Sequence, residues 1–380
     1  MLKKVILIPD SFKGTMSSTE ICQIMKEQIL AYAPNAEVIS IPVADGGEGS
    51  VDAFLSAVGG EKITLTVKGP YMEDVEAFYG ILHDGQTAVI EMAACAGLPL
   101  AGERLHPDQT TTYGVGQLMA DALERGCRKL IIGLGGSATN DLGAGAAAAL
   151  GIRFIDKDGR TFLPTGGTLG QIAHIDRQGL PASLAETEIV SMCDIDNPLY
   201  GEQGAAYVFA PQKGADAQMV KLLDKQLRLA ADTIRRELGV GIATLPGAGA
   251  AGGMGGGMAA FFGATLCMGI ETVLDTVQFD QILNGTDLVL TGEGRIDGQS
   301  LRGKVVVGVA RRCKPAGIPV IAVVGDIGDK IDSLYAEGVS AVCSINRVAV
   351  DFSVAKTRSK DDLRLTMDSL LRLFHLGVSC

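Results

Sequence analysis

The apolar positions of the chain recur as short runs, each followed by a segment with helical periodicity. Val5 to Ile8 is an uninterrupted apolar run, and Ser17 and Glu20 form the S-x-x-E pattern that is typical of a capping box at a helix start. The apolar run 38–43 leads into a second helical segment, SVDAFLSAV. Alternation of this kind predicts parallel strands joined by right-handed crossovers.

The same rhythm returns near the C-terminus. Apolar runs at 288–290, 320–324 and 341–345 end in TGEGRID, GD and NR, and a last amphipathic helix is expected over about 361–376. Together with the two N-terminal runs, these segments predict one doubly wound parallel sheet that is built from both ends of the chain.

The intervening chain has a different pattern. ITLTVK and VEAFYGIL alternate apolar and polar positions as a hairpin does, and TAVIEMA follows them. Further strands at 130–134 and 189–192, with helices at about 116–125 and 217–238, predict a mixed α/β fold. We therefore expect two domains, a doubly wound domain formed by 1–62 and 280–380, and an inserted mixed α/β domain formed by 63–279.

Composition narrows the classes of function. The formal net charge of -11 argues against a nucleic-acid partner. The uncharged stretch 246–270 consists mostly of Gly and Ala, so it does not predict a membrane span. The N-terminal apolar run is too short for a signal peptide, and the 8 cysteines form no C-x-x-C pair. We expect a cytoplasmic protein with reduced thiols.

Polar and charged residues follow the strands of the predicted doubly wound sheet. In an open parallel sheet, ligands bind beyond the carboxyl ends of the strands. Any one of these residues could instead cap a helix or form an Asx turn, but the whole set indicates a site for a small charged ligand. Its members are Asp10, Ser11, Lys13, Asp45, Glu48, Glu293, Arg295, Asp297 and Asp326.

The sequence GGSATND at 135–141 is a second candidate site, between an apolar strand and a helix rich in Gly and Ala. Backbone N–H groups at such a helix start bind anions, and Ser137 and Thr139 add hydroxyl donors. The alternative is that these small residues only allow a helix and a strand to pack closely.

The same segment also allows a dinucleotide-binding interpretation. Gly133, Gly135 and Ala138 match G-x-G-x-x-A, and Asp156 follows about 18 residues later at the end of the strand IRFI. Against this, Thr139 and Asp141 put polar groups where a pyrophosphate would lie.

Three further segments of the inserted domain carry candidate chemistry. CDIDNP places Asp194 at the end of an apolar strand, as expected for a general base. PQKGA contributes Lys213, a phosphate partner or a solvated loop lysine. PGAGAAGGMGGGMAAFFG, with Gly252 and Gly253, either cradles phosphate or packs two backbones closely.

The candidate residue types that remain favour a phosphoryl-transfer reaction. The 4 histidines show no metal-ligand spacing, and neither G-x-S-x-G nor an adjacent Ser and His indicates a nucleophilic triad. Carboxylates for Mg²⁺, basic side chains for anions and glycine loops for phosphate are the groups that such a reaction uses.

The motifs occur in an order that closely resembles the bacterial glycerate kinases of the first type. The blocks are PDSFKGTMSS, PVADGGEGSVDAF, IEMAACAGL, GLGGSATND, CDIDNPLYG, APQKGA, PGAGAAGGMG and TGEGRIDGQS. Two positions depart from the family pattern: Leu142 stands where a glycine usually follows Asn-Asp, and Gln117 where Glu is common.

The resemblance implies ATP- and Mg²⁺-dependent phosphorylation of D-glycerate in glyoxylate and aldarate breakdown. The expected product is 2-phosphoglycerate, and 3-phosphoglycerate is the alternative. The implied fold is a flavodoxin-like domain interrupted by a second α/β domain, with the active site in the cleft between them. A homodimer is left open. Outside this family, an NAD(P)-binding oxidoreductase and a non-catalytic anion-binding protein remain alternatives.

Residue roles are assigned from chemistry within this hypothesis. We expect Asp194 and Lys13 to be catalytic, and Ser11, Arg295 and Asp297 to bind the substrate. Asp45, Glu48 and Glu293 are the candidate Mg²⁺ ligands. The expected phosphate- or nucleotide-binding residues are Gly135, Gly136, Ser137, Thr139, Lys213, Gly252 and Gly253.

One apparent motif is set aside. GQSLRGK at 298–304 satisfies the first seven positions of the phosphate-loop pattern G-x-x-x-x-G-K-[ST], and Val305 takes the eighth. A phosphate loop begins directly after its strand, whereas this segment begins seven residues beyond Thr291. We therefore expect an accidental match, with Lys304 at the start of the next helix.

Overall fold

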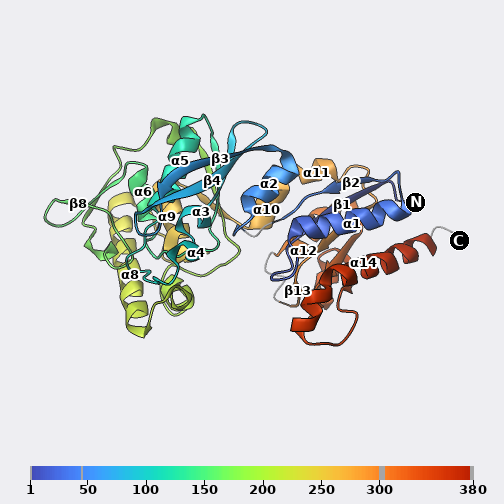
Figure 1. The fold of residues 1–380 in the computed structure, drawn as a ribbon. Coiled ribbons are helices and arrows are strands. Elements are labelled where there is room, and N and C mark those ends of the chain that lie inside the picture. Colours follow the sequence, from blue (N-terminus) through green and yellow to red (C-terminus); the bar gives the residue numbers. More distant parts are fainter. Residues whose placement is uncertain (1, 44–45, 299–303, 377–380) are drawn as a thin grey trace. The chain divides into compact units, whose positions relative to one another are not determined.

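The computed structural model describes residues 2–43, 46–298 and 304–376 (Figure 1). The chain divides into two compact units, which we call unit 1 (Met1–Ala44 and Ile270–Cys380) and unit 2 (Asp45–Gly269). Both are α/β structures with parallel strands, so the predicted fold class is confirmed.

Unit 1 contains a five-stranded sheet in which every neighbouring pair is parallel. Numbered along the chain, the strands lie in the order 2-1-3-4-5, which is the flavodoxin-like order. The sheet combines two N-terminal and three C-terminal strands, as predicted. From one edge to the other, they are β2 (Glu37–Ser40), β1 (Lys4–Pro9), β12 (Leu288–Gly292), β14 (Val320–Val324) and β16 (Val339–Ser344).

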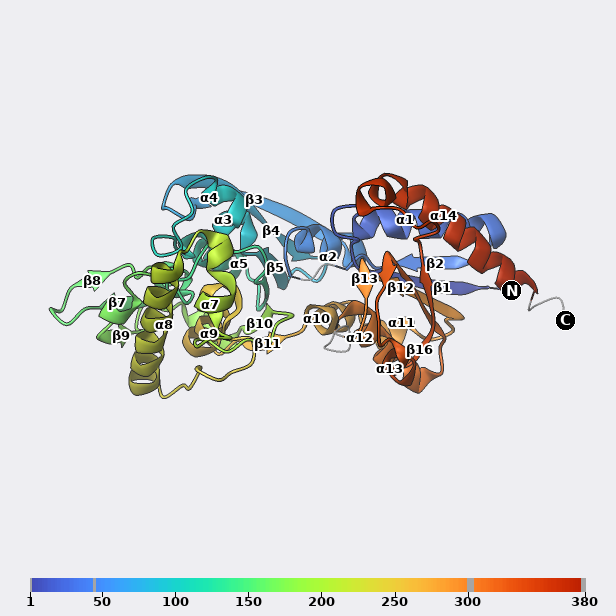
Figure 2. The same ribbon diagram turned by 90° about the horizontal axis from the view of Figure 1, so that it is seen from below.

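Helices α1 (Ser18–Tyr32) and α14 (Phe352–Leu376) lie side by side on one face of this sheet (Figures 1 and 2). The predicted capping box is present, because the Ser17 hydroxyl accepts from the N–H of Glu20 and the Glu20 carboxylate accepts from the N–H of Ser17. Ile21 and Leu363 belong to the apolar core of this unit. Helix α14 begins before the expected residue 361.

Helices α10 (Gly269–Thr276), α11 (Phe279–Ile282) and α12 (Val305–Cys313) lie on the other face (Figure 2). Lys304 is the N-cap of α12, as predicted, whereas residues 299–303 of the GQSLRGK segment lie outside the described residues. Helix α13 (Asp332–Ala336) precedes the edge strand β16.

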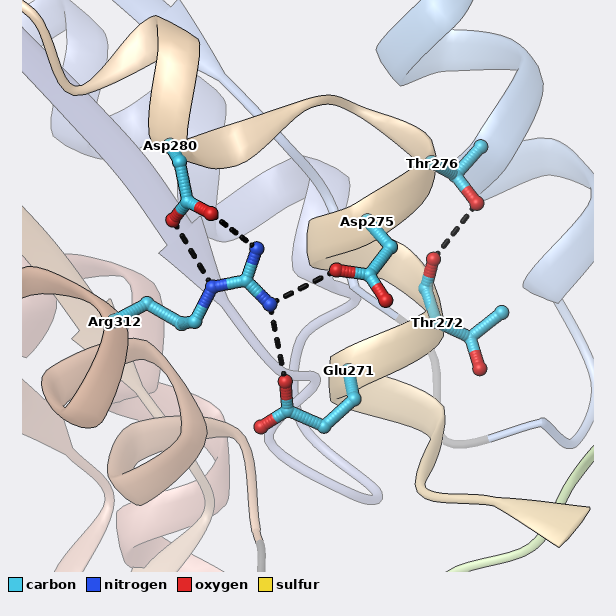
Figure 3. Close-up of polar contacts among 6 residues, drawn as sticks. All are labelled: Glu271, Thr272, Asp275, Thr276, Asp280 and Arg312. Atoms are coloured by element: carbon cyan, nitrogen blue, oxygen red, sulfur yellow. Dashed lines mark hydrogen bonds and ion pairs between the residues drawn. The ribbon is translucent and has the colours of Figure 1, made fainter.

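Arg312 of α12 joins α12 to α10 and α11 (Figure 3). Its guanidinium donates two hydrogen bonds to Asp280, at 3.0 and 2.7 Å, one to Asp275 at 2.9 Å and one to Glu271 at 3.3 Å. The hydrogen bonds to Asp280 and then to Asp275 raise the pKa of Arg312 above its usual value, against the opposing effect of burial. One side chain therefore fixes three helices.

Unit 2 contains a six-stranded sheet whose order is β11-β10-β6-β5-β4-β3. The first four strands are parallel, and β3 and β4 form the predicted antiparallel hairpin at one edge. The strands are β3 (Gly60–Lys68), β4 (Asp74–Leu82), β5 (Thr87–Glu91), β6 (Lys129–Gly133), β10 (Glu188–Met192) and β11 (Thr265–Cys267). A separate antiparallel sheet holds β7 (Arg153–Ile155), β8 (Thr161–Phe162) and β9 (His174–Asp176).

The helices of unit 2 surround two apolar cores. Helix α5 (Tyr113–Glu124) contributes Leu118 to a core that also contains Ile132 of β6. Helix α8 (Ala217–Leu238), at the predicted position, contributes Leu227 to a second core. The others are α2 (Ser50–Val58), α3 (Ala93–Ala96), α4 (Leu98–Ala101), α6 (Ala144–Ala149), α7 (Ala205–Phe209) and α9 (Ala250–Phe262). No helix in the described ranges is both long and apolar enough to cross a membrane.

The boundaries of the units differ from the expected 62/63 and 279/280. Helix α2 belongs to unit 2, because the N–H of Val51 donates to the buried Glu91 carboxylate at 2.6 Å and Val51 packs on Gly80 of β4. At the other end, the hydrogen bonds of Arg312 hold α10 to unit 1. The chain therefore passes from one unit to the other near residues 44 and 269.

Candidate active site

The carboxyl ends of β1 and β12 bring two carboxylates of unit 1 to neighbouring positions. Pro9 pairs with Gly292 in the parallel register, so Asp10 and Glu293 follow on adjacent strands. The N–H of Asp10 donates to the Gly292 carbonyl at 2.8 Å, and the N–H of Ser11 donates to the Asp10 carboxylate at 2.6 Å. Glu293 is buried, and the ammonium of Lys304 lies 3.4 Å from its carboxylate.

Arg295 lies between two carboxylates in the same part of unit 1. The short strands β13 (Arg295–Ile296) and β15 (Asp326–Ile327) pair in parallel and put Arg295 beside Asp326. The guanidinium nitrogens lie 3.5 Å from the Asp326 carboxylate and 3.7 Å from the Asp297 carboxylate. This pairing orients the guanidinium and leaves most of it accessible, since 63% of the side chain is exposed.

Lys13 lies on an exposed turn beside the TGEGRID segment. The turn closes by a hydrogen bond of 2.9 Å from the Phe12 N–H to the Met16 carbonyl. A methyl group built on Gly294 would lie 3.6 Å from the Lys13 backbone nitrogen, so the two loops are in close contact. The structure thus brings together Ser11, Lys13, Glu293, Arg295 and Asp297, which the sequence predicted at one edge of the sheet.

In unit 2, the GGSATND turn follows β6 and packs against the backbone of Gly46 and Gly47. A Cβ at Gly135 would lie only 2.5 Å from the Gly47 Cα, and one at Gly133 would lie 2.4 Å from the Gly46 carbonyl oxygen. The N–H of Gly135 donates to that same carbonyl at 2.9 Å. Gly136 has a φ of +74°, a conformation that favours glycine. The glycines are required where two backbones meet.

Lys213 is buried beneath this turn. It ends the short 3-10 helix Pro211–Lys213, and its ammonium donates 2.7 Å hydrogen bonds to the Ser137 hydroxyl and to the Thr139 carbonyl. Burial lowers the pKa of Lys213 to about 7, although the charge of Asp141 acts in the opposite direction. The structure therefore joins Ser137, Thr139 and Lys213, and the lysine is not a solvated loop residue.

Two side chains of the turn are fully buried without a hydrogen-bond partner among the described residues. They are the hydroxyl of Thr139 and the carboxamide of Asn140, both of whose polar atoms are unpaired. Asn140 was not among the residues predicted from the sequence, because a polar residue in a polar turn gives no signal that its partners are missing.

Asp141 caps two helices. Its carboxylate accepts from the N–H and the hydroxyl of Thr112 at the start of α5, at 2.7 and 2.9 Å. It also accepts from the N–H groups of Gly143 and Gly145 at the start of α6, both at 3.2 Å. Complete burial raises the pKa of Asp141, while these hydrogen bonds oppose the shift.

The glycine run at the start of α9 packs against the GGSATND turn. Gly252 has a φ of +66°, and a Cβ on it would lie 2.1 Å from the Thr139 carbonyl oxygen. A Cβ on Gly253 would lie 3.0 Å from the side chains of Leu142, Leu199 and Leu227. These surroundings favour close backbone packing over a phosphate cradle.

Asp194 lies at the carboxyl end of β10 and is exposed. Its carboxylate accepts from the N–H of Gly269 at 2.7 Å. This hydrogen bond fixes the position of one carboxylate oxygen, as a general base requires.

Comparison with known proteins decides the family. The chain matches the model of the glycerate kinase family over residues 5–375. The chain belongs to the glycerate kinase family. It is 42% identical to the glycerate kinase of Bacillus cereus, over 98% of each protein, and 43% identical to the glycerate 2-kinase of Escherichia coli, over 90% of each. A crystal structure from Salmonella typhimurium LT2 that carries a provisional glycerate kinase 2 name is 39% identical, covers 100% of both chains and superposes with a TM-score of 0.89.

Membership of the glycerate kinase family makes the protein a kinase, with ATP as the phosphoryl donor and a small molecule as the acceptor. The dinucleotide interpretation does not fit the geometry. The carboxylate of Asp156 accepts from the N–H groups of Asp158 and Arg160, at 2.8 and 2.9 Å, in the hairpin turn between β7 and β8. It therefore lies in the antiparallel sheet and not on the parallel strand beside β6, where the fingerprint requires it.

The two departures from the glycerate kinase pattern have structural counterparts. Leu142 has a φ of +60°, which is uncommon for a residue other than glycine, so the position adopts the conformation that a glycine would favour. Gln117 of α5 accepts from the N–H of Lys68 at 2.7 Å and so anchors the helix to the end of β3.

Glu91 of this glycerate kinase was also not among the residues predicted from the sequence. It ends β5, is 3% exposed and accepts from the N–H groups of Val51 and Gly49 at the start of α2. Burial raises its pKa above the usual range for Glu. Its signal was the carboxylate at the end of the apolar run TAVIE.

The residues of unit 1 fit a magnesium ion. Mg²⁺ takes oxygen ligands and commonly uses one or two carboxylates together with substrate phosphates. Asp10 and Glu293 at adjacent strand ends supply such a pair. Glu48 is exposed in unit 2, and Asp45 lies outside the described residues. In the ranges that the structure describes, no three His, Cys, Asp or Glu residues form a metal-binding group, so a protein-only metal cage is not formed there.

Proposed function

We propose that the protein transfers the γ-phosphoryl group of ATP to D-glycerate and forms 2-phosphoglycerate, as a step in glyoxylate and aldarate breakdown. The name of the Escherichia coli relative, glycerate 2-kinase, supports the position of transfer. The proposal rests on the residues at the carboxyl ends of the strands in the flavodoxin-like sheet. There Asp10, Glu293, Lys13 and Arg295 provide the carboxylates and cations that phosphoryl transfer uses.

The proposed roles follow the chemistry of each group. Asp194 accepts the proton of the attacking hydroxyl, and Lys13 neutralises the phosphoryl group during transfer. Ser11, Arg295 and Asp297 bind the acid. Glu293 would hold Mg²⁺ together with Asp10, and Asp45 and Glu48 of unit 2 are the other ligands predicted from the sequence. The groups proposed for phosphate and nucleotide are Gly135, Gly136, Ser137, Thr139 and Lys213. Gly252 and Gly253, which the sequence also predicted for this role, pack against the turn instead.

In the proposed reaction, the C2 hydroxyl oxygen of glycerate attacks the γ-phosphorus while its proton passes to Asp194. The bond between the γ-phosphorus and the bridging oxygen breaks, and ADP leaves with that electron pair. Mg²⁺, when bound, neutralises phosphate charge. The protein contributes mainly position and charge, since the phosphoryl group is transferred directly.

The deciding experiment is incubation with ATP, Mg²⁺ and D-glycerate. We expect release of ADP and a phosphorus NMR signal of 2-phosphoglycerate. A signal of 3-phosphoglycerate would establish the alternative position of transfer. No ADP release, combined with a change in NADH fluorescence on mixing, would instead support an oxidoreductase. If the protein neither releases ADP nor changes NADH fluorescence, a non-catalytic anion-binding protein is the remaining alternative.

A homodimer and a cytoplasmic location complete the proposal. Light scattering on the purified full chain gives the mass in solution, and a value near one chain contradicts the dimer. Cell fractionation tests the location.

A further inference from the structure

Strand β16 (Val339–Ser344) forms one edge of the five-stranded sheet of unit 1, and it contains no charged residue and no proline. Among the residues that the structure describes, β14 is its only neighbour in the sheet. Proteins normally protect sheet edges with charged side chains, prolines or very short strands, because an open edge pairs with other strands. The register shift of β16 lies between Val339 and Ala341, so the rest of the strand runs regularly along β14. This edge is therefore able to pair with another strand.

The other three edges of the two large sheets carry the usual protection. Strand β2 is 4 residues long and contains the exposed Glu37. Strand β3 contains Glu61, Lys62 and Lys68, and β11 has only 3 residues. Within one molecule, β16 thus differs from the edges that face water, and this contrast indicates that another strand covers it.

The backbone of β16 has hydrogen-bonding groups on its outer side. The N–H of Ile345 donates to the Val324 carbonyl at 2.9 Å. Because successive residues of a strand direct these groups to opposite sides, those of Cys343 face β14, and those of Val342 and Ser344 face outwards. Antiparallel pairing with β16 of a second copy would satisfy the outward groups on both chains, around a two-fold axis.

Exposed apolar side chains lie at both ends of β16. Before the strand, Tyr335 of α13 is 47% exposed. After it, every residue from 346 to 354 is exposed, and Val350 and Phe352 are 44% and 66% exposed. A two-fold antiparallel arrangement brings the first end of one copy to the second end of the other, so these apolar groups meet twice in one interface. Their burial supplies a driving force that backbone pairing alone lacks.

The charges that flank β16 favour the same orientation. Glu337 precedes the strand, and the exposed Arg347 follows it. Antiparallel pairing puts Glu337 of one copy near Arg347 of the other, whereas parallel pairing would put like charges together. Glu337 also binds Arg311 of its own chain, and 31% of its side chain stays exposed for a second partner.

We propose that two copies of the chain associate through β16 and join their five-stranded sheets into one continuous antiparallel pairing across the two-fold axis. This inference assigns a surface to the proposed homodimer. It does not depend on the proposed phosphoryl transfer, because its test requires neither ATP nor D-glycerate.

The first test measures the mass of the full chain by light scattering and its dissociation constant by analytical ultracentrifugation. We expect two chains per particle for the wild type. Val350→Lys should raise the dissociation constant at least about tenfold, since it puts a charge into an apolar contact on both copies. Val208→Lys is the matched control at an equally exposed valine, of α7 in unit 2, and should match the wild type.

Hydrogen exchange tests the strand edge itself. Raising the protein concentration through the dissociation constant should slow amide exchange in peptides that cover 339–344. Peptides that cover 37–40, at the opposite edge of the same sheet, should exchange at a constant rate.

Three results would overturn the inference: the mass of one chain at every concentration, a dimer that is equally strong in Val350→Lys, or exchange at 339–344 that is independent of concentration. If Val350→Lys fails to fold, Tyr335→Lys at the other end of the strand decides. A dimer formed through another surface would refute this inference and keep the proposed homodimer. Absence of D-glycerate turnover would refute the proposed reaction and leave this inference intact.

Discussion

The ammonium nitrogen of Lys213 lies 2.7 Å from the hydroxyl oxygen of Ser137, in a place where the lysine is only 2% exposed. Burial disfavours the charged form, and the pKa of Lys213 falls to about 7. Lys213 therefore changes its charge near neutral pH, although the sequence alone is equally compatible with a solvated lysine.

Replacement of Lys213 by Met should change how stability depends on pH. In the wild type, the unfolded lysine keeps its proton between about pH 7 and its unfolded pKa, and the folded one does not, so the free energy of unfolding rises with pH in that window. Relative to Lys213→Met, the wild type should gain up to about 1.4 kcal/mol per pH unit. Urea unfolding at pH 6 to 9 measures this; parallel curves would contradict it. Lys221→Met, at an exposed position of α8, is the control.

Lys13→Ala should lower kcat by about 10²- to 10³-fold, the usual cost of removing a group that stabilises charge in the transition state. The melting temperature should hardly change, because Lys13 is exposed. Steady-state kinetics with D-glycerate and ATP measure the effect. Lys3→Ala, which removes another exposed lysine of unit 1, should leave kcat unchanged. Near-normal turnover in Lys13→Ala would remove this residue from the catalytic set.

Arg312→Ala should destabilise unit 1 by about 1–3 kcal/mol, because it removes four charge-assisted hydrogen bonds and leaves three carboxylates close together. Arg311→Ala, at the neighbouring position of α12, is the matched control. It removes a single ion pair with Glu337, which contributes less than about 1 kcal/mol at the surface. Chemical unfolding compares the two. Equal losses of unfolding free energy in the two variants would show that the four hydrogen bonds of Arg312 stabilise the unit no more than a single surface ion pair does.

Gly252→Ala should be far more damaging than Gly263→Ala. Both glycines have a positive φ, of +66° and +71°, so both variants carry the conformational cost of about 1 kcal/mol. Only the methyl group at 252 meets the Thr139 carbonyl, at 2.1 Å, while no atom lies within 4 Å at 263. Thermal melting and turnover should both fall for Gly252→Ala. Similar values for the two variants would mean that the turn can move aside.

The doubly wound sheet was predictable because its strands are continuous apolar runs and its first helix carries a complete capping box. The boundaries were not predictable by the same means. The pattern SVDAFLSAV predicts an amphipathic helix that could pack on either sheet. Contacts with residues distant in the chain, namely the hydrogen bond from Val51 to Glu91 and the packing of Val51 on Gly80, assign it to unit 2.

The candidate site was predictable where chemistry follows a strand, as at Glu293, Arg295 and Asp194. It was not predictable where function depends on what surrounds a group. Among the described residues the Asn140 carboxamide has no hydrogen-bond partner, and Lys213 is buried rather than solvated; neither property is visible in the sequence. Both properties arise from packing between segments that are distant in the chain.

The pairing of β1 with β12 has a consequence for the order of assembly. Val5 pairs with Val38 of β2 and with Leu288 of β12, so β1 gains its second neighbour only after unit 2 has been synthesised. Unit 2 is one continuous segment and can complete its own sheet on the ribosome, whereas β1 must wait with the edge that later pairs with β12 unpaired. Such long-range pairing slows folding and exposes apolar edges. The N-terminal part of unit 1 therefore stays incomplete during synthesis until the last third of the chain has emerged.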